Sequence, residues 1–358
     1  MGQPEISVHD TDHLPGIAQR FGLLARRQQA LFRRTLSATA QSPDDPVGLR
    51  NGHLLAHGYE VENLYPVIRG AGGALSFFQD RRIKWWTNAR SGDRPLDPTY
   101  RGPTRNLASS QVSCVNFLLP LSLVDGGLLR FIKCLDKDAT EVLPIVDQEG
   151  RVSPVEFEWV GWEHPLEGGA VTRGANQTSV DAVIVARTGG NRVRAYLIEW
   201  KYCEEYLRSE DKSVGRAGIT RRNRYLHLYS DPDSPFQQTI PFEHFLFEPY
   251  YQIMRLLLLA REVERKGLTP DIHVDEARVV VVCPLGNEDY RKPAATTPLA
   301  LAGRFPFTSV EDVVCATLQR PGMFAMLSPE EVLASLRAES LDAVLTEWLA
   351  YHHARYGW

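Results

Sequence analysis

Two short, mostly apolar segments near the middle of the chain have the composition of β-strands, and a turn separates them. They comprise residues 179–186 and 194–202, and the sequence Thr-Gly-Gly-Asn lies between them at 188–191. Paired glycines followed by asparagine favour a tight reversal of the chain. The pattern therefore predicts a two-stranded hairpin, which brings the start of the first strand next to the end of the second.

Other segments predict the elements that surround this hairpin. Residues 249–266 carry apolar side chains almost all the way round a helix, with Pro249 suited to its first position and Gly267 to the residue after its end. Residues 277–283 form a β-branched run that is typical of a strand buried on both faces. A helix and a strand are also predicted upstream, at residues 106–119 and 155–160.

The order helix, strand, hairpin strands, long helix and buried strand predicts an α/β or α+β protein with a mixed central sheet. We expect three regions: a helical and irregular N-terminal extension (1–104), a core that holds the hairpin (105–290) and a C-terminal helical cap (291–358). The cap is expected because Ser309 and Ser328 begin sequences that match or resemble helix capping boxes.

Composition narrows the classes of protein. The chain has 358 residues, 43% of them hydrophobic, and a net charge of −4, which allows a sizeable core and excludes a polycation. Its five cysteines are scattered and include no C-x-x-C pair, which is typical of a reducing compartment. No apolar run reaches the length of a membrane span. We therefore expect a soluble cytoplasmic protein with no membrane partner.

Because the net charge is close to zero, a nucleic-acid partner would have to bind local basic patches. One patch lies on a predicted helix, residues 14–42, which carries five arginines and no acidic residue. The other surrounds Trp85-Trp86 and comprises Arg81, Arg82, Lys84 and Arg90. Either patch could contact nucleic acid. The alternatives are a solvated helix face for the first patch and a core aromatic pair with solvated flanks for the second.

The candidate chemistry lies where the two hairpin strands meet. Asp181 is near the start of the first strand, and Glu199-Trp200-Lys201 is near the end of the second. Side chains alternate along a strand, so Glu199 and Lys201 share one face. Two carboxylates and an ammonium group then meet where the apolar strands end, which is costly unless they bind something. A divalent metal ion is the natural ligand; the alternative is an edge-strand Glu–Lys pair, with Asp181 merely ending a turn.

The pattern Asp181…Glu199-Trp200-Lys201 resembles the signature of the PD-(D/E)XK nuclease superfamily, although Val180 stands where the name of the superfamily has proline. The chain is also similar, over roughly residues 105–285, to a bacterial group of restriction endonucleases within it. The similar segments are 107–111, 172–182, 198–202 and 247–255. The resemblance implies a restriction-endonuclease-like α-β-β-β-α-β core, in agreement with the predicted order. It also implies a metal-dependent nuclease, expected to be a DNA endonuclease of the restriction or defence type.

The resemblance assigns a role to each group of this pattern. Asp181 and Glu199 would hold Mg²⁺, which Mn²⁺ can replace, together with the backbone carbonyl of Trp200. Lys201 would orient or activate the attacking water. The assignment is chemically sound, because a hard metal ion neutralises the charge that develops on a phosphodiester and lowers the pKa of a bound water.

Supporting residues follow from the same resemblance. Superfamily members often have a third acid, for which we expect Glu167 ahead of Glu158, with an ordinary surface glutamate as the alternative. Gln252 and Gln111 are expected to support the site from two helices, or else only to satisfy helix backbone groups.

The expected partner is nucleic acid, and by the resemblance double-stranded DNA. Arg173 lies in one of the similar segments, and Arg221 and Arg222 lie in a basic loop expected after the second hairpin strand. These three are candidates to contact phosphates, and a solvated charged loop is the alternative. The alternative function is a catalytically silent module with a nuclease fold that binds nucleic acid or a protein partner.

Overall fold

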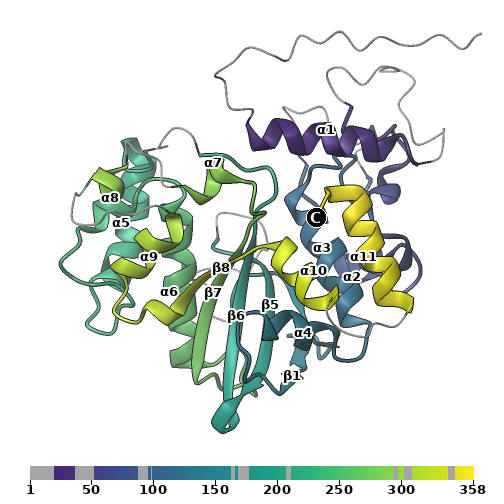
Figure 1. Ribbon diagram of the computed structural model, residues 1–358. Helices are drawn as coiled ribbons and strands as arrows, with labels where there is room; N and C mark the ends of the chain where they lie inside the picture. The colour runs from purple at the N-terminus through teal and green to yellow at the C-terminus, as the bar shows by residue number, and fades with distance from the viewer. Residues whose placement is uncertain are drawn as a thin grey trace, which may run out of the picture.

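The structure is a computed structural model, and it describes residues 20–36, 52–87, 96–97, 99–162, 166–167, 177–206, 211–292, 297–301, 309–337 and 343–358. A six-stranded mixed sheet lies between two layers of helices (Figure 1). Helices precede the first strand of the sheet in the sequence, and a helix is the last element of the chain. The predicted α/β class with a mixed sheet is therefore confirmed.

The sheet has the strand order β1-β5-β6-β7-β8, and β4 also pairs with β5. Strand β5 is antiparallel to β1, β4 and β6, whereas β6, β7 and β8 are parallel to one another. A separate small sheet pairs β2 (Ile145–Val146) with β3 (Val152–Ser153). The strands of the main sheet are β1 (Glu141–Leu143), β4 (Glu156–Trp159), β5 (Val180–Thr188), β6 (Arg192–Trp200), β7 (Glu276–Val282) and β8 (Phe324–Leu327).

The predicted hairpin is formed by β5 and β6. Their register runs from Thr188↔Arg192 to Ala182↔Ile198, around a turn at Gly189–Asn191. Gly190 has φ +71°, a left-handed conformation that favours glycine. The sequence order helix, three antiparallel strands, helix and parallel strand is also present as α3 (Ser110–Ser122), β4, β5, β6, α6 (Tyr250–Lys266) and β7.

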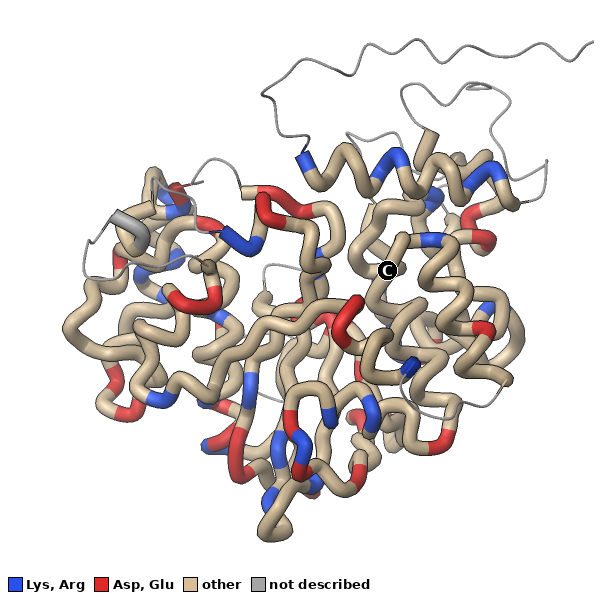
Figure 2. The backbone as a smooth tube through the Cα atoms, in the orientation of Figure 1, with Lys and Arg blue, Asp and Glu red and all other residues tan. Residues whose placement is uncertain are grey.

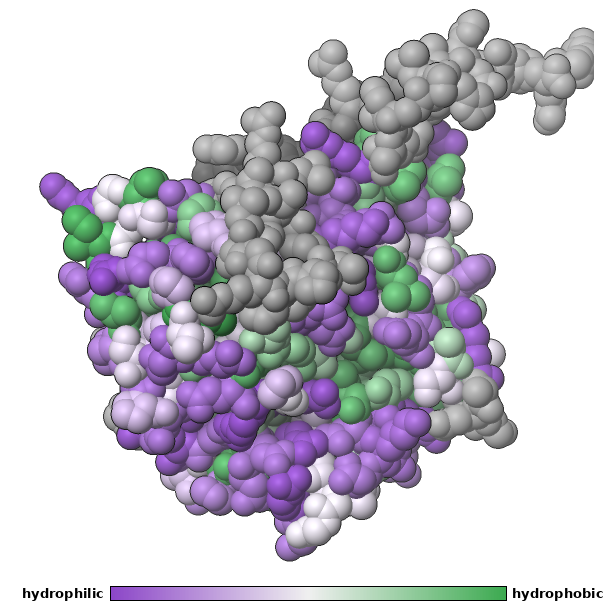
Figure 3. Space-filling model, turned by 60° about the vertical axis from the view of Figure 1, so that its left-hand side comes forward, coloured by the Kyte–Doolittle hydropathy of each residue, from purple (hydrophilic) through white to green (hydrophobic). Residues whose placement is uncertain are grey.

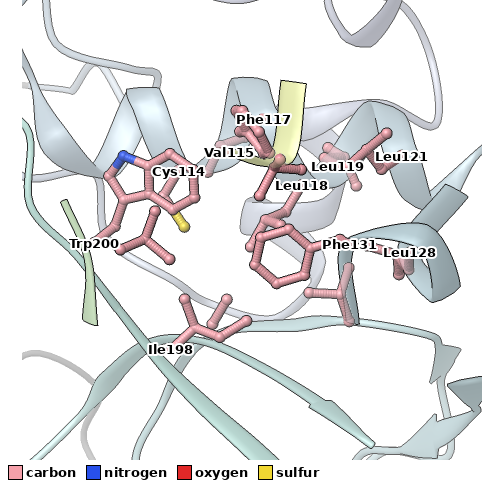
Figure 4. Packing of buried hydrophobic residues seen from close by; sticks show 14 of the residues in the cluster. Cys114, Val115, Phe117, Leu118, Leu119, Leu121, Leu128, Phe131, Ile198 and Trp200 are labelled. Atoms are coloured by element: carbon pink, nitrogen blue, oxygen red, sulfur yellow. The ribbon is translucent and has the colours of Figure 1, made fainter. Parts of the chain in front are cut away.

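Alternate residues of the central strands pack into two separate cores, one on each face of the sheet. Helices α3, α4 (Gly127–Lys133) and α11 (Ala343–Tyr356) cover the face that carries Ile198 and Trp200. Helix α6 covers the other face, which carries Leu197 and Val281. Figure 4 shows Trp200 and Ile198 in one cluster with Phe117 of α3 and Phe131 of α4. Both faces are therefore buried, as the continuous apolar run in β7 predicts.

The prediction of a long buried helix is confirmed by α6. It begins at Tyr250, directly after Pro249, and Gly267 follows its last residue with φ +86°. A Cβ atom at Gly267 would lie 2.8 Å from the carbonyl oxygen of Ile272, so this turn requires glycine for both space and conformation. The helix is fixed at both ends, which holds its side chains in a constant position over the sheet.

Two predicted segments differ from the structure. Arg221 and Arg222, predicted in a loop after β6, lie in helix α5 (Gly215–Tyr229). The predicted C-terminal cap is not wholly helical, because β8 adds a sixth strand to the sheet. Its capping box at Ser309 is confirmed. The remaining helices are α1 (Phe21–Arg33), α2 (Ala74–Asp80), α7 (Glu288–Arg291), α8 (Pro298–Leu301), α9 (Val310–Thr317) and α10 (Pro329–Arg337), with short 3-10 turns at Glu60–Asn63, Pro66–Ile68, Phe242–Phe245 and Pro321–Met323.

The N- and C-terminal regions pack against each other. Gln29 of α1 donates hydrogen bonds of 2.8 Å both to the carbonyl of Arg355 and to the hydroxyl of Tyr202. Helix α1 lies across the end of the molecule above α3 and α11 (Figure 1). Figure 2 shows basic and no acidic positions along this helix. The N-terminal patch therefore lies on a helix that is anchored close to the end of β6.

The described surface is mainly hydrophilic in the view of Figure 3, where apolar residues gather near the centre of the face. Within the described ranges, no single helix is long and apolar enough to cross a membrane. Helices α3 and α4 meet that criterion only as a pair, with a bend of 116° between them.

Candidate active site

The predicted site lies at the end of the sheet where β5 begins and β6 ends. The register of β5 and β6 runs through Ala182↔Ile198, and extending it by one residue places Asp181 opposite Glu199. The register of β4 and β5 pairs Phe157 with Ala182 and Trp159 with Val180, which places Glu158 opposite Asp181. Three neighbouring strands therefore each contribute one carboxylate to the same row across the sheet.

Asp181 is fixed by the backbone of β6. Its Oδ2 accepts a hydrogen bond of 2.6 Å from the N–H of Trp200, which takes the place of a further ladder bond between β5 and β6. The N–H and C=O of a strand residue face the same neighbouring strand, so the Trp200 carbonyl lies on the side of Asp181. Burial, Glu199 and Glu158 raise the pKa of Asp181 well above its usual value, and Lys201 partly opposes them.

Glu199 and Lys201 form a buried ion pair. The distance between Lys201 Nζ and Glu199 Oε1 is 2.7 Å, and both side chains are less than 10% exposed. Lys201 is held in place by its backbone N–H, which donates to the carbonyl of Val282 in β7 at 2.8 Å. Burial lowers the pKa of Lys201, but Glu199 together with Tyr206, Glu204 and Tyr290 outweighs this effect, and the net shift is upward. Lys201 is therefore a cation in this site.

Gln252 reaches the same carboxylate from α6. Its Nε2 donates to Glu199 Oε1 at 2.6 Å. The predicted support from this helix is therefore present as a contact. Glu199 Oε1 accepts from two donors, one on its own strand segment and one on a helix that packs over the sheet. The orientation of the Glu199 carboxylate is thus determined by two separate elements.

The donor set of this pair suits a hard divalent cation. Within the described residues, Asp181 Oδ1 and Glu199 Oε2 accept no hydrogen bond, whereas the other oxygen of each carboxylate does. One oxygen of each carboxylate is therefore free to bind a metal ion, beside a backbone carbonyl that faces the same way. No group of three or more His, Cys, Asp and Glu side chains in the described part of the chain could hold a metal ion. The donors are thus two carboxylates and not a cluster of three.

Glu158 is the acid that completes the row, and its backbone is unusual. It is 4% exposed and has φ +49°, a left-handed conformation that is costly for a residue with a side chain. Glu158 Oε1 accepts hydrogen bonds from Gln111 Nε2 at 2.8 Å and from Trp86 Nε1 at 3.0 Å. Gln111, expected to support the site, therefore contacts Glu158 and neither Asp181 nor Glu199.

Glu167, which the sequence analysis placed ahead of Glu158, is engaged elsewhere. Its Oε1 accepts from the N–H and hydroxyl of Thr178 at 2.9 and 2.6 Å, and from the hydroxyl of Tyr225 at 2.6 Å. These contacts tie it to α5 and to the segment before β5. Glu167 therefore joins α5 to the segment before β5. The structure does not place it with the carboxylates of Asp181 and Glu199.

The basic residues expected to contact nucleic acid have different positions. Arg221 and Arg222 lie on α5, where Arg221 donates to the carbonyl of Lys212 at 2.8 Å. Arg222 forms an ion pair with Glu243. Arg173 lies outside the described residues. The two described arginines each have a partner within the protein, which weakens the case for them as phosphate contacts.

The sequence analysis gives Glu158 only as the second candidate for a third acid, and it does not connect Trp86 with the site. Trp85 and Trp86 are adjacent and have the same basic residues around them in the sequence. Only the contact of Trp86 with Glu158 in the structure distinguishes the two. Tyr206 and Tyr290 were not singled out. Tyr290 is buried and Tyr206 is partly buried near Lys201, whose charge partly opposes the rise in their pKa that burial causes. Nothing in the sequence pattern distinguishes these tyrosines from ordinary core residues.

Comparison with protein-family models gives a match over most of the chain. A family model described as "Restriction Endonuclease associating with ARP" matches residues 87–357, which is most of the chain. The match confirms the resemblance to restriction endonucleases that the sequence motifs indicate. Searches of curated proteins and of solved structures found no match.

Proposed function

The chain belongs to the family described as restriction endonuclease associating with ARP, and on that premise we propose that it is a Mg²⁺-dependent DNA endonuclease whose site is formed by Asp181, Glu199 and Lys201. The family name indicates a nuclease, and a restriction endonuclease implies a DNA substrate. The metal, the catalytic residues and the restriction-endonuclease-like core are parts of the proposal.

One observation supports the proposal above all others: the two carboxylates meet with an unused oxygen on each. Asp181 and Glu199 lie opposite each other at the end of a hairpin, and each has one oxygen fixed by donors and one left over. A hard cation binds such oxygens together with a backbone carbonyl, here that of Trp200. Without a cation the carboxylates repel one another, in keeping with the raised pKa of Asp181.

Lys201 and Gln252 would have different roles in the reaction. A bound Mg²⁺ would neutralise charge on the phosphate and lower the pKa of a coordinated water. Lys201 uses one N–H for Glu199 and has two more to donate to the attacking water or to a phosphate oxygen. Its pKa is raised, so it acts as a cationic donor and not as the base that accepts the proton. Gln252 holds the Glu199 carboxylate in position for the metal ion and for Lys201.

We assign the place of third acid to Glu158 and not to Glu167. Glu158 is opposite Asp181 in the sheet and contributes to the upward shift of its pKa. It is held back by Gln111 and Trp86, so it adds negative charge to the site at a distance from the two primary ligands. Glu167 uses its Oε1 for Thr178 and Tyr225.

Cleavage of long unmodified DNA tests the proposal. Wild-type protein should cleave plasmid or phage DNA in Mg²⁺ or Mn²⁺ and not in EDTA, and Asp181→Asn and Lys201→Met should abolish cleavage. Asp275→Asn is a matched control, because Asp275 Oδ2 accepts from the N–H of Val193 at 2.8 Å, at the other end of β6. Lys266→Met is a control on an exposed lysine that pairs with Glu262.

The outcomes separate the proposal from its alternative. Cleavage by wild type and by both controls, with none by Asp181→Asn or Lys201→Met, would support it. Wild-type-like cleavage by either site variant would reject the assignment of that residue. DNA binding by wild type without cleavage of any substrate would favour the catalytically silent module.

A further inference from the structure

Residues 81–86 alternate between buried and exposed positions. Arg81 and Ile83 are buried, and Trp85 is partly buried, whereas the residues between them are exposed. The inward side chains are firmly held: Arg81 Nε lies 2.9 Å from Glu156 Oε1, and the ring of Trp85 stacks on Phe78 with a centroid distance of 3.8 Å. The three outward side chains are therefore presented by a segment that is anchored at every second residue.

The outward side chains are two cations followed by an aromatic ring. They belong to Arg82, Lys84 and Trp86, and the indole of Trp86 is 46% exposed. Neither Arg82 nor Lys84 forms an ion pair within the described residues. Such an uncompensated row, basic and then aromatic, has the composition of a surface that follows a nucleic-acid strand.

The acidic residues nearby do not neutralise this row. Arg82 and Lys84 line a cavity of about 460 Å³, whose other walls include Asp147, Glu149 and Glu156. Each of these acids already has a basic partner that is not part of the row. Asp147 and Glu149 pair with Arg151, and Glu156 pairs with Arg81. Because Arg151 serves two of the three acids, these acids offset the row only in part, and the remaining positive charge of Arg82 and Lys84 is left for a partner from outside the protein.

Trp86 connects the row to the carboxylates of the site. Its N–H donates to Gln111 Oε1 at 2.8 Å, and its indole Nε1 donates to Glu158 Oε1 at 3.0 Å. Gln111 Nε2 in turn donates to Glu158 Oε1 at 2.8 Å and to the carbonyl of Lys84 at 3.0 Å. These bonds hold the exposed indole beside the acid that lies opposite Asp181, so whatever contacts the indole lies next to the site.

We propose that Arg82, Lys84 and Trp86 bind the DNA strand that is cut, with the two cations on consecutive parts of its phosphate backbone and the indole against the nucleotide beside the scissile bond. The inference rests on the proposed function. It adds a substrate-binding segment that precedes the stretch matched by the family model, residues 87–357. It also gives Trp86 a second effect as a positioning residue, because its indole N–H helps to orient Glu158.

Salt dependence of DNA binding tests the two cations. Binding of a fluorescent DNA duplex is measured by anisotropy without divalent metal, so that no cleavage occurs. Each phosphate contact contributes about 0.9 to the slope of log K against log salt. Arg82→Ala/Lys84→Ala should therefore reduce the slope by about 1.8. The control Lys133→Ala/Lys137→Ala removes two exposed lysines beside Asp138, which contacts Gly189 at the opposite end of the sheet; it should leave the slope unchanged.

Two substitutions of Trp86 separate its two effects. Trp86→Ala should weaken DNA binding roughly 5- to 100-fold, the range expected for loss of one base-stacking contact. Trp86→Phe keeps a ring but loses the indole N–H. It should bind DNA nearly as well as wild type while the Mg²⁺ concentration needed for half-maximal cleavage changes. A ring with a purely structural role would give similar losses in both variants.

The outcomes either support the inference or overturn it. A wild-type salt slope in Arg82→Ala/Lys84→Ala, or the same change in the control, would overturn it. So would wild-type DNA affinity in Trp86→Ala. Arg82→Ala/Lys84→Ala and Trp86→Ala alter exposed side chains, and thermal unfolding that matches that of wild type confirms that these variants fold. Absence of cleavage by wild type would contradict the proposed function but not this inference, which is measured by binding.

Discussion

Asp181 in β5 accepts the backbone N–H of Trp200 in β6 at 2.6 Å, so the first carboxylate of the site is bonded to the residue directly between Glu199 and Lys201. This contact fixes the separation of the two strands at the point where their ladder ends. It also turns one oxygen of Asp181 towards β6 and leaves the other free. The geometry of the site thus depends on a side-chain-to-backbone bond at the end of a hairpin.

Replacement of Asp181 by Asn should make the metal-free protein more stable while it abolishes cleavage. Burial and the carboxylates of Glu199 and Glu158 raise the pKa of Asp181. A carboxyl group with a raised pKa costs stability once pH exceeds its unfolded pKa, because the unfolded chain then ionises more readily. Asn removes this charge and can still accept from Trp200. We expect a gain of about 0.5–2 kcal/mol in unfolding free energy at pH 8, measured by urea denaturation in EDTA; a loss would contradict the account.

Replacement of Lys201 by Met should lower both stability and activity. It leaves Glu199 as a buried carboxylate without its ammonium partner, which costs about 3–5 kcal/mol. Cleavage should fall below detection, because loss of one donor to developing charge typically costs a factor of about 10²–10³ in rate. The double variant Glu199→Gln/Lys201→Met should regain much of the stability without regaining cleavage. Chemical denaturation of wild type, Glu199→Gln, Lys201→Met and the double variant gives the coupling energy between the two residues. Additive effects on stability would show that the pair is not energetically linked.

Replacement of Gln252 by Met should weaken metal binding and leave DNA binding unchanged. Gln252 donates to the oxygen of Glu199 that faces Lys201, and loss of such a supporting bond typically weakens metal affinity by about 10–100-fold. Titration with Mn²⁺ followed by calorimetry measures the change. Gln237→Met is the control, because Gln237 donates to the carbonyl of Ala316. Equal Mn²⁺ affinity in wild type and Gln252→Met would argue against Glu199 as a ligand.

His352 should make the protein less stable as the pH falls below 7. His352 is completely buried, and burial lowers its pKa to about 3. The unfolded chain binds a proton near pH 6.5 and the folded protein does not, so stability is lost as pH decreases through that value. This contribution amounts to about 2 kcal/mol between pH 7 and pH 5. Denaturation at several pH values should show it in wild type and not in His352→Gln.

The parts of the fold that sequence could predict are those with a strong local signal. The hairpin follows from a turn that lies midway between Asp181 and Glu199, so one register brings them together. Helix α6 follows from its apolar residues and from Gly267. Strand β8 could not be predicted, because four residues between helices carry too little periodicity. Helix α5 was missed because only Gly218, Tyr225 and Tyr229 are buried along its length.

The site divides in the same way. Asp181, Glu199 and Lys201 are close in sequence to one turn, so local geometry determines their approach. The place of Glu158 depends on a backbone conformation of φ +49° and on donors from Trp86 and Gln111. These are long-range features without a pattern in the chain. Glu167 is the favoured third acid in the sequence, and only the contacts with Thr178 and Tyr225 show that its Oε1 is used elsewhere.

The most direct test of the central claim is the anomalous scattering of Mn²⁺ in crystals of the protein. The account predicts a peak that lies within coordination distance of one oxygen of Asp181, one oxygen of Glu199 and the carbonyl of Trp200, and that is lost in Asp181→Asn. A peak bound by other residues, or none near these carboxylates at a saturating Mn²⁺ concentration, would contradict it.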